Sequence, residues 1–349
     1  MRSIMHRSVR GFAAALVIVW TVLVTGAAAA TPLRVVSSTP DLGSLVREVG
    51  GDRVELTVLA RPTEDPHFVE AKPSFVKALN AADAFVVGGM EMEAGYAPVL
   101  LTGARNNKIL PGNPGYIDAS VVVQPLDVPV GAVDRSMGDV HPAGNPHYLL
   151  DPLMGLKVAA LLRDSFSGLA PGDAVYFAQR YDDFRRRLND DLVGAALAKT
   201  YDAEKLALLF EYGTLTPFLE QQGVAGELGG WLGALAPYFG TKAVDDHPMW
   251  PYFARRFGLQ IVGHLEPKPG VPPTTKHLQE LVQAMQRLHV PLILANAYYD
   301  PRHADFVAAE TGARVARMAN QAGARPETDA YLAMVNYNVE QVVQALRRP

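Results

Sequence analysis

The chain has 349 residues, of which 49% are hydrophobic and 19% are charged, and its formal net charge is −4. This balance is typical of a globular protein and argues against disorder. The small negative charge provides no basic surface for nucleic acid, so a nucleic-acid partner is not expected. The length suits two domains with separate hydrophobic cores.

Residues 1–30 have the features of a secretory signal peptide. Three arginines precede an apolar run at residues 11–25, and four alanines follow at 27–30. The run is shorter than the ~20 apolar residues that a membrane span needs, so we predict export and cleavage near Ala30. Because the chain contains no cysteine, it has neither disulfides nor a cysteine for a lipid anchor. We expect a periplasmic protein that is not lipid-anchored.

Short apolar strands and amphipathic helices alternate at the start of the mature chain. Strands are expected at residues 33–38, 54–59 and 84–87, with helices at 41–49 and 73–81. Short buried strands separated by helices are typical of a parallel sheet that is covered by helices on both faces.

The middle of the chain breaks this alternation. Residues 111–146 are rich in Pro, Gly and Asp and predict a long surface loop. A helix is expected at 151–162. A longer helix is expected at 172–199, because Phe177, Tyr181 and later apolar residues recur there at helical spacing.

The alternation then resumes to the end of the chain. Strands are expected at 242–244, 259–262, 291–295 and 315–318, and helices at 248–257, 274–288, 301–311 and 330–346. We therefore predict an α/β fold of two lobes, each a mainly parallel sheet flanked by helices, joined by one long backbone helix. The predicted boundaries are an N-terminal metal-binding lobe at 31–165, a connecting helix at 166–200 and a C-terminal metal-binding lobe at 201–349.

The candidate functional residues are histidines that follow predicted strands or loops and precede helices. Of nine histidines, His67, His147 and His247 have this placement. Ligands of open α/β sheets gather outside the carboxyl ends of the strands. Three imidazoles and a fourth oxygen ligand make a tetrahedral zinc site. The sequence thus predicts a metal ion between the lobes, with His141 as a competitor for one position.

Enzymatic interpretations find little support. The chain has no His-Glu-x-x-His pair, no Gly-x-Ser-x-Gly turn and no Gly-x-Gly-x-x-Gly loop. A zinc hydrolase would need three histidines and an open position, and it is kept as an alternative, although no general base is evident. We predict that the protein is not an enzyme.

Several motifs resemble the zinc- and manganese-binding receptors of ABC importers. They include Asp65-Pro66-His67, Gly144-Asn145-Pro146-His147-Tyr148 and Tyr252-Phe253-Ala254-Arg255-Arg256-Phe257. The resemblance covers essentially the whole mature chain. It implies two lobes bridged by a rigid helix, a metal ion held in the cleft, and delivery to a permease in the inner membrane. It also implies that His67, His147 and His247 are the metal ligands.

The fourth ligand departs from the family pattern. Many members carry Asp or Glu just after the last strand, where this chain has Met318-Ala319-Asn320-Gln321. Water or a nearby acid such as Asp300 is then the expected fourth ligand. The His-rich loop of many zinc-specific members is also absent, since residues 111–146 contain only His141.

Zinc is the favoured ion, because imidazoles suit zinc whereas manganese prefers oxygen ligands. Manganese or iron is the alternative, and an adhesin-like surface role is a further one. We expect a monomer.

Overall fold

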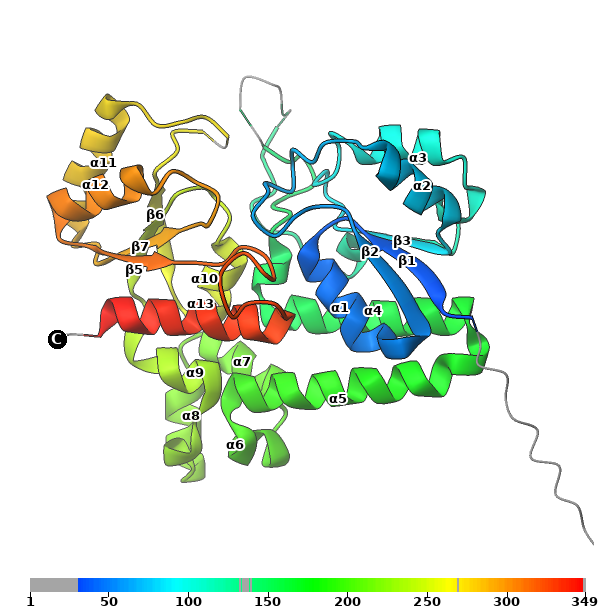
Figure 1. The fold of residues 1–349 in the computed structure, drawn as a ribbon. Helices are drawn as coiled ribbons and strands as arrows, with labels where there is room; N and C mark the ends of the chain where they lie inside the picture. Colours follow the sequence, from blue (N-terminus) through cyan, green and yellow to red (C-terminus); the bar gives the residue numbers. More distant parts are fainter. Residues whose placement is uncertain (1–30, 132, 134–137, 139, 269, 348–349) are drawn as a thin grey trace, which may run out of the picture. The chain divides into compact units, whose positions relative to one another are not determined.

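The computed structural model describes residues 31–131, 133, 138, 140–268 and 270–347. The predicted signal peptide, residues 1–30, lies outside the described residues. From Pro32 onward the chain forms one unit, built from two four-stranded sheets and the helices around them (Figure 1). The predicted α/β fold with two mainly parallel sheets is confirmed. No helix among the described residues is long and apolar enough to span a membrane.

The first sheet has the strand order β2-β1-β3-β4, and every neighbouring pair is parallel. Its strands are β1 (Leu33–Ser37), β2 (Val54–Val58), β3 (Ala84–Val87) and β4 (Tyr116–Asp118). The helices of this lobe are α1 (Pro40–Gly50), α2 (Pro73–Ala81) and α3 (Ala97–Ala104). Prolines at the starts of all three helices fit there because the first turn leaves backbone N–H groups without helical partners.

The second sheet repeats this winding. Its strand order is β6-β5-β7-β8, and every neighbouring pair is again parallel. In each sheet the first strand in the chain is an inner strand, the second lies at the edge beside it, and the third and fourth lie on its other side. The strands are β5 (Lys242–Asp245), β6 (Gln260–His264), β7 (Leu292–Ala295) and β8 (Arg314–Arg317). The helices are α10 (Pro251–Phe257), α11 (Thr275–Leu288) and α12 (Pro301–Thr311).

The inner strands β1, β3, β5 and β7 are largely buried, which explains why they read as apolar runs, whereas the edge strands β2 and β6 are partly exposed. Successive side chains of a strand point to opposite faces. Val35 therefore joins the main core, whereas Val36 joins a smaller core with residues of α2 and α3. In the second sheet Leu292 joins the main core and Ile293 joins a smaller core with residues of α11 and α12.

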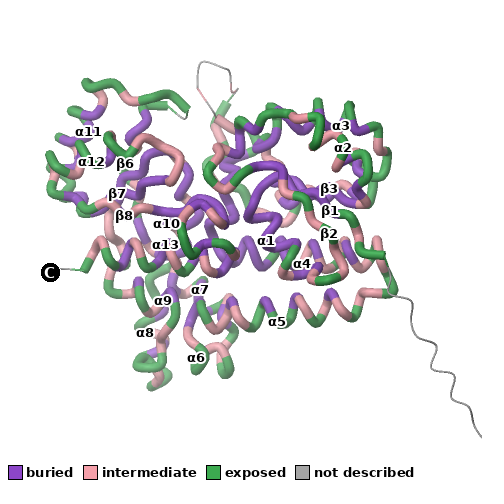
Figure 2. Tube along the Cα trace, viewed as in Figure 1, coloured by how far each residue is buried: buried purple, intermediate pink, exposed green. Residues whose placement is uncertain are grey.

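The main core continues from both sheets into a layer of helices (Figure 2). These helices are α4 (Pro152–Leu169), α5 (Ala174–Val193), α6 (Ala195–Thr200), α7 (Ala203–Glu211), α8 (Leu215–Gln222), α9 (Gly230–Leu235) and α13 (Tyr331–Leu346). Figure 1 shows α4 and α5 running side by side beneath the first lobe. The apolar stripe predicted from Phe177 and Tyr181 is buried along α5.

The long helix predicted at 172–199 is divided at Gly194. This residue has φ +87° and separates α5 from α6. A Cβ atom at Gly194 would lie 3.0 Å from the Cα of Gly229, so the backbone before α9 passes too close for a side chain. Contact between distant backbones ends the helix here, and the apolar periodicity of the sequence carries no signal for it.

The predicted loop at 111–146 contains more structure than expected. Residues 116–118 form β4, which pairs with β3, and residues 119–122 form a short 3-10 helix. The strand β4 could not be predicted because its three residues are too few to show the alternation of apolar and polar residues that indicates a strand.

Buried polar contacts join the two lobes. Arg256 of α10 makes a two-pronged ion pair with Asp151, at 2.9 and 3.0 Å, and Asp151 also caps α4. The Tyr252 hydroxyl accepts from the backbone N–H of Leu126 and donates to the backbone oxygen of Asn145. One turn of α10 thus fastens the second lobe to the segment that leads from the first lobe into α4.

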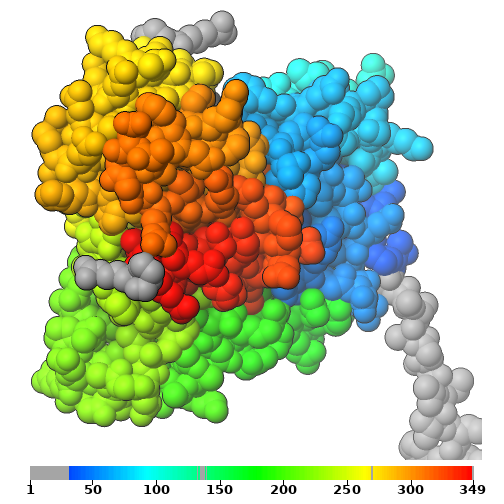
Figure 3. Space-filling view, turned by 60° about the vertical axis from the view of Figure 1, so that its left-hand side comes forward, coloured from blue at the N-terminus to red at the C-terminus, as the bar shows by residue number. Residues whose placement is uncertain are grey.

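The segment after β8 makes a second connection. The backbone N–H of Ala322 donates to Asp41 at the start of α1, and Gln321 donates to the backbone oxygen of Glu64. Figure 3 shows the orange-red surface of the late chain lying against the blue surface of the first lobe.

Candidate metal site

Three of the predicted ligands lie where loops of both lobes converge. His67 follows β2, His147 immediately precedes the short 3-10 helix Tyr148–Leu150, and His247 lies between β5 and α10. All three residues are buried, with 6%, 8% and 3% of their surface exposed, respectively. Burial of three imidazoles in loops is unusual for side chains with polar nitrogens and points to a common role.

The three rings are spaced as neighbours around one point. Ring centroids are 5.3 Å apart for His67 and His147, 5.6 Å for His147 and His247, and 6.4 Å for His67 and His247. Imidazoles sharing one tetrahedral ion through bonds of about 2.0–2.1 Å have centroids roughly 5 Å apart. Within the described residues no group of three or more His, Asp and Glu side chains already has the geometry to hold an ion. Binding would require the rings to turn or draw together slightly.

His67 is oriented by the aspartate two residues before it. The Oδ1 atom of Asp65 accepts from the backbone N–H of His67 at 3.0 Å and contacts its ring Nδ1 at 2.8 Å. An ionised carboxylate can only accept, so Nδ1 carries a proton, and in the neutral ring Nε2 carries the lone pair. This is the tautomer that binds a metal through Nε2.

Asn145 repeats this arrangement for His147. Its Oδ1 accepts from the backbone N–H of His147 at 3.0 Å and contacts its Nδ1 at 2.9 Å. The amide orientation is fixed because Nδ2 donates to the backbone oxygen of Pro248 at 2.7 Å. Nδ1 of His147 is therefore the protonated nitrogen. Its Nε2 is buried and has no hydrogen-bond partner among the described residues.

His247 is held by a different element. Its Nδ1 contacts Oε2 of Glu266 at 2.8 Å, and the same oxygen accepts from the backbone N–H of Gly270 at 2.9 Å. The ring of Tyr299 stacks on His247 with centroids 5.9 Å apart. All three candidate ligands thus have Nδ1 tied to an oxygen acceptor, the outer-shell pattern of metal-binding histidines.

Burial keeps His147 neutral. Desolvation lowers the pKa of His147 well below the usual value for histidine, and the neighbouring His67, His247 and His141 lower it further. A metal ion needs the neutral imidazole, so the environment that opposes protonation favours a cation bound through Nε2.

The predicted competitor His141 belongs to the same group of side chains. Its ring centroid lies 5.1 Å from that of His67. Together with His147 and His247 it also lines a cavity of about 490 Å³ that opens beside the cluster. The structure therefore brings four histidines together.

The predicted fourth ligand Asp300 has other partners. It caps α12 through the backbone N–H of Arg302 and pairs with the guanidinium of the same residue. The Arg302 side chain holds the pKa of Asp300 near 2. Asp300 lines a separate cavity that none of the four histidines lines.

The position after β8 holds amides in place of a carboxylate. Asn320 and Gln321 are both buried, and Gln321 donates to the first lobe as described above. Their side-chain oxygens have no hydrogen-bond partner among the described residues. Neither amide is a charged ligand, so the donors near the cluster are mainly imidazole nitrogens.

Neither Asp245 nor Asp246 occupies the N-cap position of α10, although both precede this helix. Trp250 occupies the N-cap position of α10, and its side chain makes no capping hydrogen bond. Asp245 contacts Nδ1 of His264, and Asp246 accepts from the backbone N–H of Asn296. Burial opposes a charge on His264, but the Asp245 carboxylate outweighs it and raises the pKa of His264.

Sequence reasoning missed the residues that orient the ligands. A sequence pattern could have indicated two of these residues, Asp65 and Asn145, because each begins the same motif, Asx-Pro-His, which ends at His67 or His147. An Asx side chain commonly bonds the backbone two residues on, and here it also reaches the ring. Glu266 is 19 residues from His247 and meets it only through the pairing of β5 with β6, so no local pattern predicts that contact.

The geometry agrees with a family comparison. The family model described as "ZnuA: Zinc-uptake complex component A periplasmic" matches residues 35–202 and 233–345. The chain belongs to this family. It is therefore a metal-binding substrate-binding protein of the type that serves ABC importers. Residues 203–232, which include α7 and α8, fall outside the matched ranges.

Individual relatives are distant in sequence and similar in fold. A manganese ABC transporter substrate-binding lipoprotein PsaA from Streptococcus anginosus is 20% identical over 324 residues, which are 90% of each chain. A crystal structure of ZnuA has a TM-score of 0.65 at 20% identity, covering 90% of this chain and all of the other. A manganese-bound periplasmic metal binding protein from Candidatus Liberibacter asiaticus, an S38A mutant, has a TM-score of 0.63 at 16% identity, covering 90% and 99%.

Proposed function

We propose that this protein captures zinc from the periplasm and delivers it to an ABC permease in the inner membrane. In this proposal His67, His147 and His247 bind the ion between the two lobes. One observation carries it: three buried imidazoles from both lobes converge, each with Nδ1 held by an oxygen acceptor. In each neutral ring Nε2 would then be the nitrogen that binds the ion.

The chemistry of the donors supports zinc over manganese. Nitrogen ligands suit zinc, whereas manganese is better served by carboxylate, carbonyl and water oxygens. The carboxylates of Asp65 and Glu266 are engaged with imidazole Nδ1 atoms. Manganese is the second candidate, because the PsaA relatives are named for manganese.

For the fourth position we propose His141 or a water molecule. His141 is the nearest further imidazole, with its ring 5.1 Å from that of His67. A four-imidazole site would be closed, whereas three imidazoles and water would leave one exchangeable position. Asp300 is a weaker candidate because Arg302 neutralises it.

The proposal also includes a location, the periplasm. Cleavage of residues 1–30 would release the mature chain into the periplasm, and the lack of cysteine in the sequence leaves no residue for a lipid anchor. The mature protein would act as a monomer.

Metal analysis tests this function. Protein purified from the periplasm without added metal or chelator should carry zinc at close to one equivalent, measured by inductively coupled plasma mass spectrometry. Saturating zinc should also raise the melting temperature, since an ion that binds only the folded state stabilises it by roughly 4 kcal/mol at a thousand times Kd. Protein that carries manganese and no zinc would contradict the zinc proposal and would indicate a manganese receptor.

The stability of the metal-free protein should depend on pH through His147. The folded state holds the pKa of His147 below that of the unfolded chain, so the unfolded state binds more protons below pH ~6.5. The stabilising contribution is complete above that pH and is lost as the pH falls. The expected slope is about 1.4 kcal/mol per pH unit. Urea unfolding at pH 7.5, 6.5 and 5.5 measures it.

A control variant is needed because Asp41 acts in the opposite direction. Burial raises the pKa of Asp41 to about 7, although the N–H of Ala322 lowers it in part. The folded state therefore gains a proton at Asp41 as the pH falls below 7, which stabilises it. Comparing the parent with His147→Gln isolates the histidine contribution. Identical slopes in the two proteins would contradict the prediction.

A further inference from the structure

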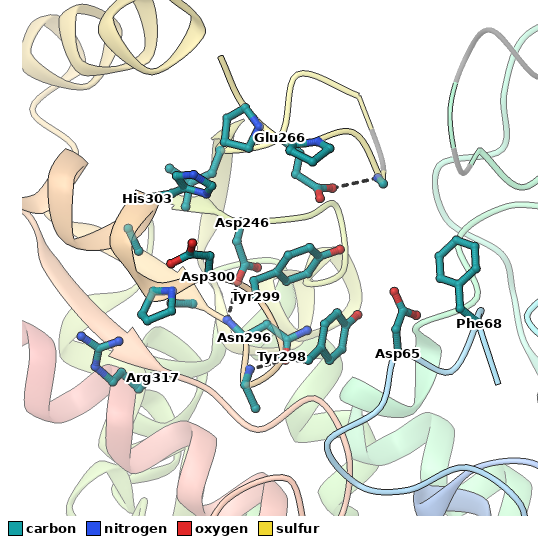
Figure 4. Close-up of a pocket in the computed structure, with 18 of the residues that line it drawn as sticks. Asp65, Phe68, Asp246, Glu266, Asn296, Tyr298, Tyr299, Asp300, His303 and Arg317 are labelled. Atoms are coloured by element: carbon teal, nitrogen blue, oxygen red, sulfur yellow. Dashed lines mark hydrogen bonds between the residues drawn. The ribbon is translucent and has the colours of Figure 1, made fainter. Parts of the chain in front are cut away.

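A second cavity adjoins the histidine cluster, because Asp65 and Glu266, which contact His67 and His247, line it. Its volume is about 390 Å³, much larger than a metal ion. Figure 4 shows Asp65 and Phe68 of the first lobe facing Tyr298, Tyr299 and Asn296 of the second. None of the four clustered histidines lines it.

The lining carries an excess of negative charge. Four carboxyl groups line the cavity, those of Asp65, Asp246, Glu266 and Asp300, together with the guanidinium groups of Arg317 and Arg325. Arg302 neutralises Asp300, and burial raises the pKa of Asp246 well above its usual value, so the negative charge comes from Asp65 and Glu266. Arg317 is itself paired with Asp305 outside the lining, at 2.8 Å. An anion would therefore be repelled, and a cation would be attracted.

One buried oxygen gives the cavity a specific acceptor. Asp246 is 4% exposed and lines the cavity. Its Oδ2 accepts from the backbone N–H of Asn296, whereas its Oδ1 is buried with no hydrogen-bond partner among the described residues. A buried polar atom without a partner is costly. Burial also raises the pKa of Asp246 well above its usual value, and an ammonium group that donates to Oδ1 would favour the ionised carboxylate.

Aromatic rings provide the remaining walls. Tyr298 and Tyr299 lie with ring centroids 4.7 Å apart on the side of the second lobe. Phe68 approaches from the first lobe and is 70% exposed. Aromatic faces attract cations, and the combination of rings with carboxylates is the usual chemistry for ammonium recognition.

We propose that this cavity is a second binding site, which takes a small organic ammonium compound with an apolar or aromatic body. The ammonium group donates to Asp246 Oδ1 and lies in the field of Asp65 and Glu266. The body of the ligand packs between Phe68 and the two tyrosines. The residues lining this site are distinct from the histidines that are candidates for zinc.

The two sites share their outer residues. Asp65 and Glu266 line the cavity and also orient His67 and His247. If these histidines bind zinc, which rests on the proposed function, a bound ammonium would compete for the same carboxylate oxygens and repel the ion. Each ligand would then weaken the other by the same factor.

Calorimetry on the metal-free mature chain with three probes of similar shape tests the site. Phenethylamine carries the ammonium group, 2-phenylethanol is neutral and 3-phenylpropionate is anionic. Phenethylamine should bind at least about tenfold more tightly than 2-phenylethanol, and 3-phenylpropionate should not bind. Equal binding of the cationic and neutral probes, or preference for the anion, would overturn the proposal.

Variants locate the site independently of zinc. Asp246→Asn should weaken phenethylamine binding at least about tenfold, because an amide oxygen still accepts from Asn296 but cannot ionise when the ammonium binds. Phe68→Ala should weaken it several-fold without risk to folding, since that side chain is exposed. Glu280→Gln, an exposed carboxylate on α11, is the matched control and should have no effect. Unchanged binding in both Asp246→Asn and Phe68→Ala would place the ligand elsewhere and overturn the proposal.

Discussion

Replacing His147 by alanine is expected to weaken zinc binding by more than about 100-fold. Loss of an outer-shell partner alone typically costs 10–100-fold in metal affinity, and a ligand contributes more than its partner. His147 is the residue with the buried Nε2 that lacks a partner among the described residues, so its removal deletes a preformed donor. Competition titration against a chromophoric zinc chelator at pH 7.5 measures the change.

The same loss is expected for His67→Ala and His247→Ala. His289→Asn is the matched control, because His289 is an exposed histidine outside the cluster. Its backbone has φ +52°, a left-handed conformation that asparagine tolerates. Parent-like affinity in all three alanine variants would show that the ion binds elsewhere.

Removing the Arg256 side chain is expected to destabilise the protein by about 3–5 kcal/mol. Arg256 and Asp151 are 4% and 0% exposed, and Arg256→Leu would leave the Asp151 carboxylate buried without its counter-ion. Leucine fills part of the space, so the lost charge pairing dominates the effect. The free energy of unfolding in urea measures it.

The double variant Arg256→Leu with Asp151→Asn distinguishes an unpaired charge from lost packing. Asparagine keeps the oxygen that caps α4 by accepting from Leu153, but it carries no charge. The double variant should therefore be more stable than Arg256→Leu alone. A double variant that is equally or less stable would contradict the role of the ion pair.

The sequence predicts the lobes and the candidate ligands because both depend on local features. Buried parallel strands read as apolar runs, and three histidines follow turns at the starts of helices. The break at Gly194 was missed because the apolar periodicity continues past it, although glycine is a usual residue at the end of a helix. The close approach of the backbone at Gly229, 35 residues away in the chain, has no local signal. Charge alone suggested Asp300 as a fourth ligand, whereas the neighbouring Arg302 engages it.

The residues that orient the histidines also fall into two groups, those that a local sequence pattern can indicate and those that it cannot. Asp65 and Asn145 lie two residues before their histidines, within reach of a local motif. Glu266 reaches His247 only because β5 and β6 are adjacent in the sheet. The repeated winding of the two sheets is likewise invisible in the sequence, since parallel order is set by packing between distant segments.

X-ray absorption spectroscopy at the zinc K-edge, on the zinc-loaded mature protein, tests the central claim most directly. We predict a four-coordinate ion with at least three imidazole nitrogens at about 2.0–2.1 Å. The outer-shell scattering of imidazole rings should be clear, and it should diminish in His147→Ala. A five- or six-coordinate ion with mainly oxygen ligands would contradict the account.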